Sequence, residues 1–141
     1  MKKLLIAILL FVTGIAVYGQ KVDFSTYERV FSRGKVTIVC QTDEYRLIVG
    51  SLKNPQTSLL IGTYPQAAVS SLNSLLRKGE NEETLRRPLP TTLGGIRFTV
   101  TVSGPSDNRT FSLRGMDNPA RFKLNSQDIR TMMQAILDSG N

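Results

Sequence analysis

Histidine is absent from this sequence of 141 residues. Without an imidazole group, the chain cannot use Ser-His or Cys-His nucleophilic catalysis, a histidine general base or a histidine-ligated zinc site. Three other signatures of catalysis are missing as well, since we find no Gly-rich phosphate loop, no Cys-x-x-Cys and no nucleophile elbow. These absences favour a non-catalytic protein that needs no cofactor and no metal.

Cysteine occurs once, at Cys40, so the chain cannot form an internal disulfide. Cys40 lies in an apolar, alternating segment, and no histidine is available to activate its thiol. We therefore expect a buried and unreactive thiol, and a fold stabilised by packing alone.

Acidic residues are few, 11 against 18 basic ones. A glycosidase needs two carboxylates at a fixed separation in a cleft, and a calcium loop needs acids at regular alternating positions. The acids here fall mainly in expected turns and in the segment 80–95, with neither pattern. An enzyme that uses carboxylates or a hydroxyl nucleophile without histidine remains the alternative interpretation.

The N-terminal segment has the organisation of a secretory signal peptide. Lys2 and Lys3 precede an apolar run of 14 residues, from Leu4 to Val17. A retained membrane anchor is the competing interpretation, but a spanning helix needs about 20 apolar residues. No later segment is long and apolar enough to span a bilayer.

Small or short residues at Val17 and Gly19 fit the specificity of signal peptidase, which predicts cleavage between Gly19 and Gln20. The predicted organisation is a signal peptide over 1–19 and a single mature domain over 20–141. The mature protein is expected to be exported, either periplasmic or secreted, from a bacterial-type cell.

Cleavage of the signal peptide would lower the net charge of the protein. The full chain carries a net charge of +7, and loss of the two N-terminal lysines leaves 16 basic and 11 acidic residues, a net charge of +5. This balance favours anionic polymers or acidic partners. Nucleic acid is not expected, because single-strand recognition combines cations with stacking aromatic side chains, and the expected cationic face has none.

Alternating apolar residues predict strands, and apolar stripes at helical spacing predict helices. The expected strands are 35–42, 45–50, 58–61, 96–103, 109–114 and 121–124, and the expected helices are 63–78 and a last helix capped by Asn125. Within 20–34, the spacing of Phe24, Tyr27 and Phe31 favours a short helix, with a strand as the alternative. Two prolines and a Gly-Gly pair in 80–95 predict a mobile connector.

The two halves, about 35–79 and 96–140, share one order of parts: two strands, an Asn-Pro turn, a short strand, a helix and a glycine. The predicted fold is therefore α+β, a tandem βββα-βββα pseudo-repeat. Its sheet would be antiparallel with about six strands, and two helices would cover one face.

Alternation in the second half leaves one sheet face polar. Hydroxyl and cationic side chains share this face: Arg97, Thr99, Thr101, Thr110, Ser112, Arg114, Arg121 and Lys123. They are the candidate binding residues, for an anionic or polar partner. An ordinary solvated sheet face is the competing interpretation. Arg86 and Arg87 in the connector are a second, weaker candidate.

The sequence thus predicts an exported, non-catalytic binding or interaction module of the bacterial periplasm or cell exterior. Its partner would be another envelope protein or an anionic polymer. Two alternatives stay open: a small envelope enzyme without histidine, and a subunit of an envelope assembly whose exposed edge strands pair with another chain.

Overall fold

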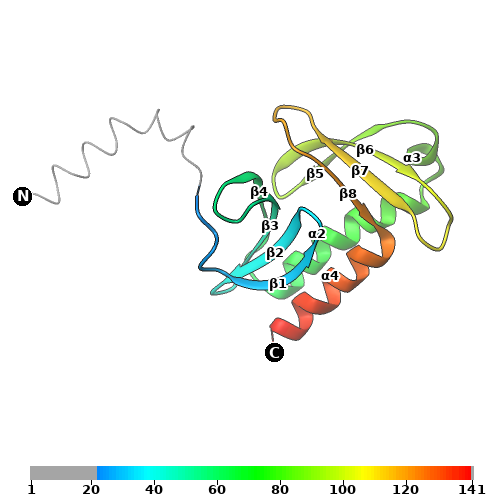
Figure 1. The fold of residues 1–141 in the computed structure, drawn as a ribbon. Coiled ribbons are helices and arrows are strands. Elements are labelled where there is room, and N and C mark those ends of the chain that lie inside the picture. Colours follow the sequence, from blue (N-terminus) through cyan, green and yellow to red (C-terminus); the bar gives the residue numbers. More distant parts are fainter. Residues whose placement is uncertain (1–21, 141) are drawn as a thin grey trace, which may run out of the picture.

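The computed structural model of the protein describes residues 22–140 (Figure 1). The expected signal peptide and its cleavage site at Gly19 and Gln20 lie outside these residues. The described part begins with an antiparallel sheet of four strands in chain order: β1 (Glu28–Arg33), β2 (Val36–Gln41), β3 (Glu44–Gly50) and β4 (Pro55–Gly62).

Helical segments connect this sheet to a second one. They are α2 (Pro65–Arg77), the 3-10 helix η2 (Lys78–Glu80) and α3 (Glu82–Arg86). The second sheet is again an antiparallel meander in chain order: β5 (Leu89–Leu93), β6 (Ile96–Ser103), β7 (Thr110–Gly115) and β8 (Arg121–Asn125). Helix α4 (Ser126–Ser139) follows directly.

The α+β class is confirmed, but the expected single sheet of six strands with two helices is wrong. Two four-stranded sheets and three α-helices are present in residues 22–140. The segment 20–34 contributes strand β1 instead of a helix, and the supposed connector 80–95 contains α3 and β5. Each half is consequently a four-stranded meander with a long helix after it, instead of βββα.

Strand β5 forms despite its proline because of where that proline lies. Gly94 and Gly95 both have positive φ, +59° and +78°, as a two-residue type I′ hairpin requires. From this turn the ladder places Pro90 opposite Thr99, at a position whose nitrogen faces away from β6. An edge strand tolerates proline there, since no ladder hydrogen bond is lost.

The main hydrophobic core is shared by both sheets and both long helices. Helices α2 and α4 lie side by side in Figure 1, and a Cβ at Gly140 would clash with Pro65. The end of α4 therefore contacts the start of α2, so the two helices run antiparallel. Leu72 and Ile136 are fully buried members of this core, as the apolar stripes predict.

The ends of the long helices have further features. Tyr64, which precedes α2, makes no side-chain cap. Gly79 is close to Phe111, where a Cβ would lie 2.9 Å from the ring. Leu137, near the end of α4, is exposed.

The first sheet is buried on both of its faces. Val39 and Ile48 point away from the helices, and Phe24, from the segment before β1, packs over them together with Leu52. The Tyr27 ring meets the Phe24 ring edge to face at 5.0 Å. This cover explains why β2 and β3 have near-continuous apolar runs.

The second sheet is buried on one face only. Along β6, Phe98, Val100 and Val102 are buried, whereas the residues between them are exposed or half-buried. The cationic and hydroxyl side chains of the outer face are accordingly available to a ligand. No helix within residues 22–140 is long and apolar enough to cross a membrane.

Candidate anion-binding groove

A cavity of about 690 Å³ lies over the outer face of the second sheet. The tip of the β1–β2 hairpin from the first sheet forms its other wall. The lining residues are Arg33, Gly34, Lys35, Val36, Pro88, Thr99, Thr101, Ser112, Leu113, Arg114, Arg121, Phe122 and Lys123. We call this cavity the groove.

Leu113 and Phe122 also border the groove, although both residues are buried. The polar lining comes from alternate positions of β6, β7 and β8 and from the tip of the β1–β2 hairpin. Three residues supply hydroxyls and five supply cations, and no carboxylate belongs to the lining within residues 22–140. Register places hydroxyls and cations next to each other, since Thr99 lies opposite Arg114 and Ser112 opposite Lys123.

Strand register brings two of the cations face to face. Arg114 lies directly opposite Arg121 in the β7–β8 ladder. The neighbouring Gly115 donates a backbone hydrogen bond to Ala120, so the Arg114–Arg121 pair is a non-hydrogen-bonded one. In such pairs the Cα atoms are only about 4.5 Å apart. Like charges directly opposite each other destabilise a sheet, which makes this pair costly for the fold alone.

The β1–β2 hairpin adds two further cations, Arg33 and Lys35, on either side of Gly34. Gly34 has a φ of +59° and occupies the first position of a two-residue loop, as in a type II′ turn. This tight turn holds both cationic residues at the tip. Their side chains are exposed, so they can reach a ligand in the groove.

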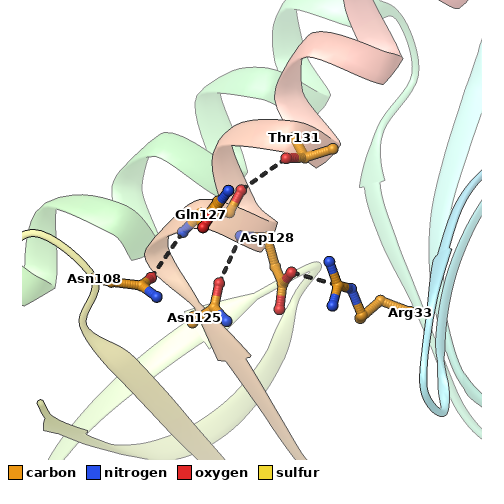
Figure 2. Close-up of polar contacts among 6 residues, drawn as sticks. All are labelled: Arg33, Asn108, Asn125, Gln127, Asp128 and Thr131. Atoms are coloured by element: carbon orange, nitrogen blue, oxygen red, sulfur yellow. Dashed lines mark hydrogen bonds and ion pairs between the residues drawn. The ribbon is translucent and has the colours of Figure 1, made fainter.

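Arg33 also connects the hairpin to helix α4 (Figure 2). Its Nε lies 3.3 Å from Oδ1 of Asp128, whose side chain is 10% exposed against 69% for Arg33. Asp128 occupies the first turn of α4, where its backbone N–H donates to Oδ1 of Asn125 at 2.7 Å. Asn108 Oδ1 accepts from the backbone N–H of Gln127 in the same turn. The expected Asn125 cap is thereby confirmed.

Among the described residues, the other four groove cations have no carboxylate partner. Every ion pair of residues 22–140 other than Arg33–Asp128 lies outside the groove. Uncompensated positive charge inside a concave site raises the local concentration of anions. Arginine is suited to hold them, since its planar guanidinium can bind carboxylate, sulfate or phosphate in a bidentate manner.

Asp128→Asn is expected to have opposite effects on stability and on anion binding. Loss of a carboxylate from the first turn of α4 and of its ion pair should lower the free energy of unfolding by about 1 kcal/mol. Anion affinity should rise severalfold, because Arg33 loses its competing partner. Urea denaturation and a binding titration on the same samples measure both effects. Weaker anion binding by the folded variant would contradict this assignment of Arg33.

Six of the eight sequence-predicted site residues line the groove: Thr99, Thr101, Ser112, Arg114, Arg121 and Lys123. The other two do not. Arg97 pairs with Asp117, at 2.5 Å between Nη2 and Oδ2, outside the groove. Thr110, at the start of β7, is also outside its lining. A role of these residues in binding stays a prediction.

Sequence reasoning missed the hairpin wall of the groove. Its tip, residues 33–35, has a glycine between two cations, which is a recognisable turn sequence. The turn was missed because a helix was expected over 20–34. Arg86 and Arg87, the second candidate, pair with Glu82 and Glu83 along α3 and are not part of the groove.

No group of three or more Cys, Asp or Glu side chains within 22–140 is arranged to hold a metal ion. A second cavity, about 400 Å³, lies where Phe24 and Tyr27 cross the first sheet. Its one ionised side chain, Arg46, is already bound to Glu44 Oε1 at 2.5 Å and lies 5.8 Å from the Phe24 ring.

Cys40 is half-buried at the end of β2. Its thiol donates to the backbone oxygen of Thr42 at 3.1 Å. Burial raises the pKa of the Cys40 thiol, and the nearby carboxylates of Glu28 and Asp43 raise it further. A raised pKa lowers the thiolate fraction at neutral pH, and the thiolate is the nucleophile.

Labelling of Cys40 by a thiol-specific reagent at pH 7 is therefore expected to be at least about tenfold slower than labelling of the unfolded chain. The rate should rise with pH well beyond neutrality. Rate measurements between pH 6 and 10, with the urea-unfolded protein as the reference, test this. A native thiol that reacts as fast as the unfolded one at pH 7 would contradict it.

Comparisons with known proteins identify no relative: no family model, no curated protein sequence and no solved structure matches this chain significantly.

Proposed function

We propose that the mature chain is an exported, non-catalytic binding module that holds an anionic ligand in the groove. The ligand's charges bind the cations of β7, β8 and the β1–β2 hairpin. The predicted signal peptide supports a location in the periplasm or outside the cell.

One observation carries the proposal: Arg114 and Arg121 lie directly opposite each other and line the groove, and neither has a carboxylate partner within residues 22–140. A purely structural sheet face would gain from an acid at either position. A local rule broken without compensation elsewhere in the fold is typical of functional sites. An anionic ligand supplies the missing compensation.

Binding of anionic probes by the mature chain, residues 20–141, tests the proposal. The probes are fluorescent poly-glutamate, a sulfated polysaccharide and phosphatidylglycerol vesicles. Arg114→Ala/Lys123→Ala is expected to weaken binding of the recognised probe at least about tenfold, because two charge-assisted contacts are lost.

The matched control is Arg130→Ala/Lys53→Ala, which removes the same charge from exposed positions outside the groove. It should retain affinity within about twofold at physiological salt, where distant charges are screened. If the two double variants lost equal affinity for the probe, binding would depend on net charge alone. That result would contradict the assignment of the binding site to the groove. Binding of none of the three probes by the wild type would overturn the proposal as well.

A further inference from the structure

We infer that the occupant of the groove is an extended, acidic segment of a partner protein, which adds to the second sheet as a strand along β8. This inference rests on the proposed function. It goes further by naming the ligand class and the main-chain contacts that would hold it.

Strand β8 is the last strand of its sheet, and in the part of the chain that the structure describes it pairs only with β7. Ser126 donates its backbone N–H to Arg109, and Gly115 donates to Ala120, which fixes the alternation of the ladder. The backbone N–H and C=O groups of Arg121 and Lys123 consequently point away from β7. Neither residue makes a backbone hydrogen bond to another main-chain group in residues 22–140.

The same two residues place their side chains in the groove. A strand added beside β8 would lie about 4.8 Å away, and alternate side chains of that strand would project over the groove face. Those side chains would lie opposite Arg121 and Lys123, two residues apart. Opposite charges at such positions stabilise strand pairing. The complementary segment therefore has an acid at every second residue.

The hairpin tip gives this segment a second wall. Arg33 and Lys35 line the groove together with β8, so an added strand would lie between cations on two sides. Because the groove belongs to both sheets, its full charge exists only in the folded domain.

Cations on an edge strand also have a protective role, since they discourage association of sheet edges. That role and the proposed one agree. A cationic edge rejects neutral or basic strands, including another copy of β8, and accepts an acidic strand. When a peptide binds by strand addition, main-chain hydrogen bonds usually supply the affinity and side chains supply the specificity. Here the charges of the side chains would supply the specificity.

Two peptides of identical composition test the inference: an octapeptide of alternating Glu and Thr, and one with four Glu followed by four Thr. The alternating peptide is expected to bind at least about tenfold tighter, because only its charges can all face the groove. Two N-methylated forms of the alternating peptide are compared, one methylated at the odd-numbered amides and one at the even-numbered amides. Methylation of the amides that point toward β8 should abolish binding, and methylation of the other set should leave it nearly unchanged. Equal effects of the two methylations would overturn strand addition.

Lys123→Pro compared with Lys123→Ala tests the same contact from the protein side. Both lose the charge, but only proline loses the outward N–H, and neither alters a hydrogen bond to β7. The proline variant should bind the alternating peptide at least about tenfold more weakly than the alanine variant. If the proline variant does not fold, the N-methylated peptides still decide, because they use the unmodified protein.

Failure of this inference differs from failure of the proposed function. Preferential binding of the sulfated polysaccharide or the vesicles through Arg114 and Lys123, with no preference between the two octapeptides, would keep the anion site and overturn the acidic strand. Loss of all anion binding would overturn both.

Discussion

Arg121→Glu is expected to make the protein more stable and to remove its binding of anions. The substitution converts the Arg114–Arg121 repulsion into an attraction across a non-hydrogen-bonded pair. A favourable cross-strand charge pair contributes about 0.2–1 kcal/mol, so the free energy of unfolding should rise by up to about 1 kcal/mol. Anion affinity should fall by about a hundredfold, because one cation is lost and an acid faces the ligand.

Urea denaturation and titration with the recognised anionic probe measure the two effects. Arg97→Glu is the matched control, since it makes the same replacement on the same sheet outside the groove. It removes an exposed ion pair and leaves an acid beside Asp117, so stability should fall by about 0.5 kcal/mol. Its anion affinity should change little. A loss of stability in Arg121→Glu, or equal binding losses in the two variants, would contradict the functional interpretation of the Arg114–Arg121 pair.

Local patterns predicted most of the second sheet. The alternation in β6 separates Phe98, Val100 and Val102, which are buried, from the polar residues between them. Period-2 alternation is a direct consequence of strand geometry, so such faces are readable without knowing the partner strands. The Asn125 cap is equally local, because it depends only on residues three apart.

The edge strands β1 and β5 were not predicted, because each has only one neighbouring strand and its own sequence pattern is weak. Strand β1 has two half-buried residues, Val30 and Phe31, in an otherwise exposed segment. Their aromatic and polar neighbours match a helix as well as a strand. Strand β5 contains Pro90, and the tolerance of that proline depends on which way its nitrogen faces, a fact set by the ladder. The Gly94–Gly95 pair was the available hairpin signal.

The polar face was predictable, but the groove over it was not. Alternation predicts that Arg114, Arg121 and Lys123 share a face. The strand register in the structure shows in addition that Arg114 lies opposite Arg121. The hairpin wall comes from a different sheet, and nothing in a local pattern says that residues 33–35 approach β8. The division of the eight strands into two sheets also depends on tertiary packing. Neighbouring strands of each hairpin form the same hydrogen bonds whether the strands belong to one continuous sheet or to two.

Phe98→Ala is expected to be the most destabilising of the substitutions considered, and to affect both sheets. Phe98 is fully buried, and its ring meets Phe122 edge to face at 5.7 Å. Removal of a buried phenylalanine costs about 3–5 kcal/mol, a large share of the roughly 5–15 kcal/mol typical of a domain. Because one hydrophobic core includes side chains of both sheets, the loss should lower the stability of the first sheet as much as that of the second.

Urea unfolding monitored by circular dichroism, together with hydrogen exchange of β3 and β7, tests this expectation. Both strands should lose protection by the same free energy, and unfolding should remain a single transition. Phe24→Ala is the comparison, since Phe24 belongs to the separate cluster over the outer face of the first sheet. It should increase exchange in 22–27 and leave α2 protected. If Phe98→Ala exposed β7 while β3 kept its protection, the two halves would be independent folding units. In that case the groove between them would vary with their relative motion, and its cations would not be held in one arrangement by a common core.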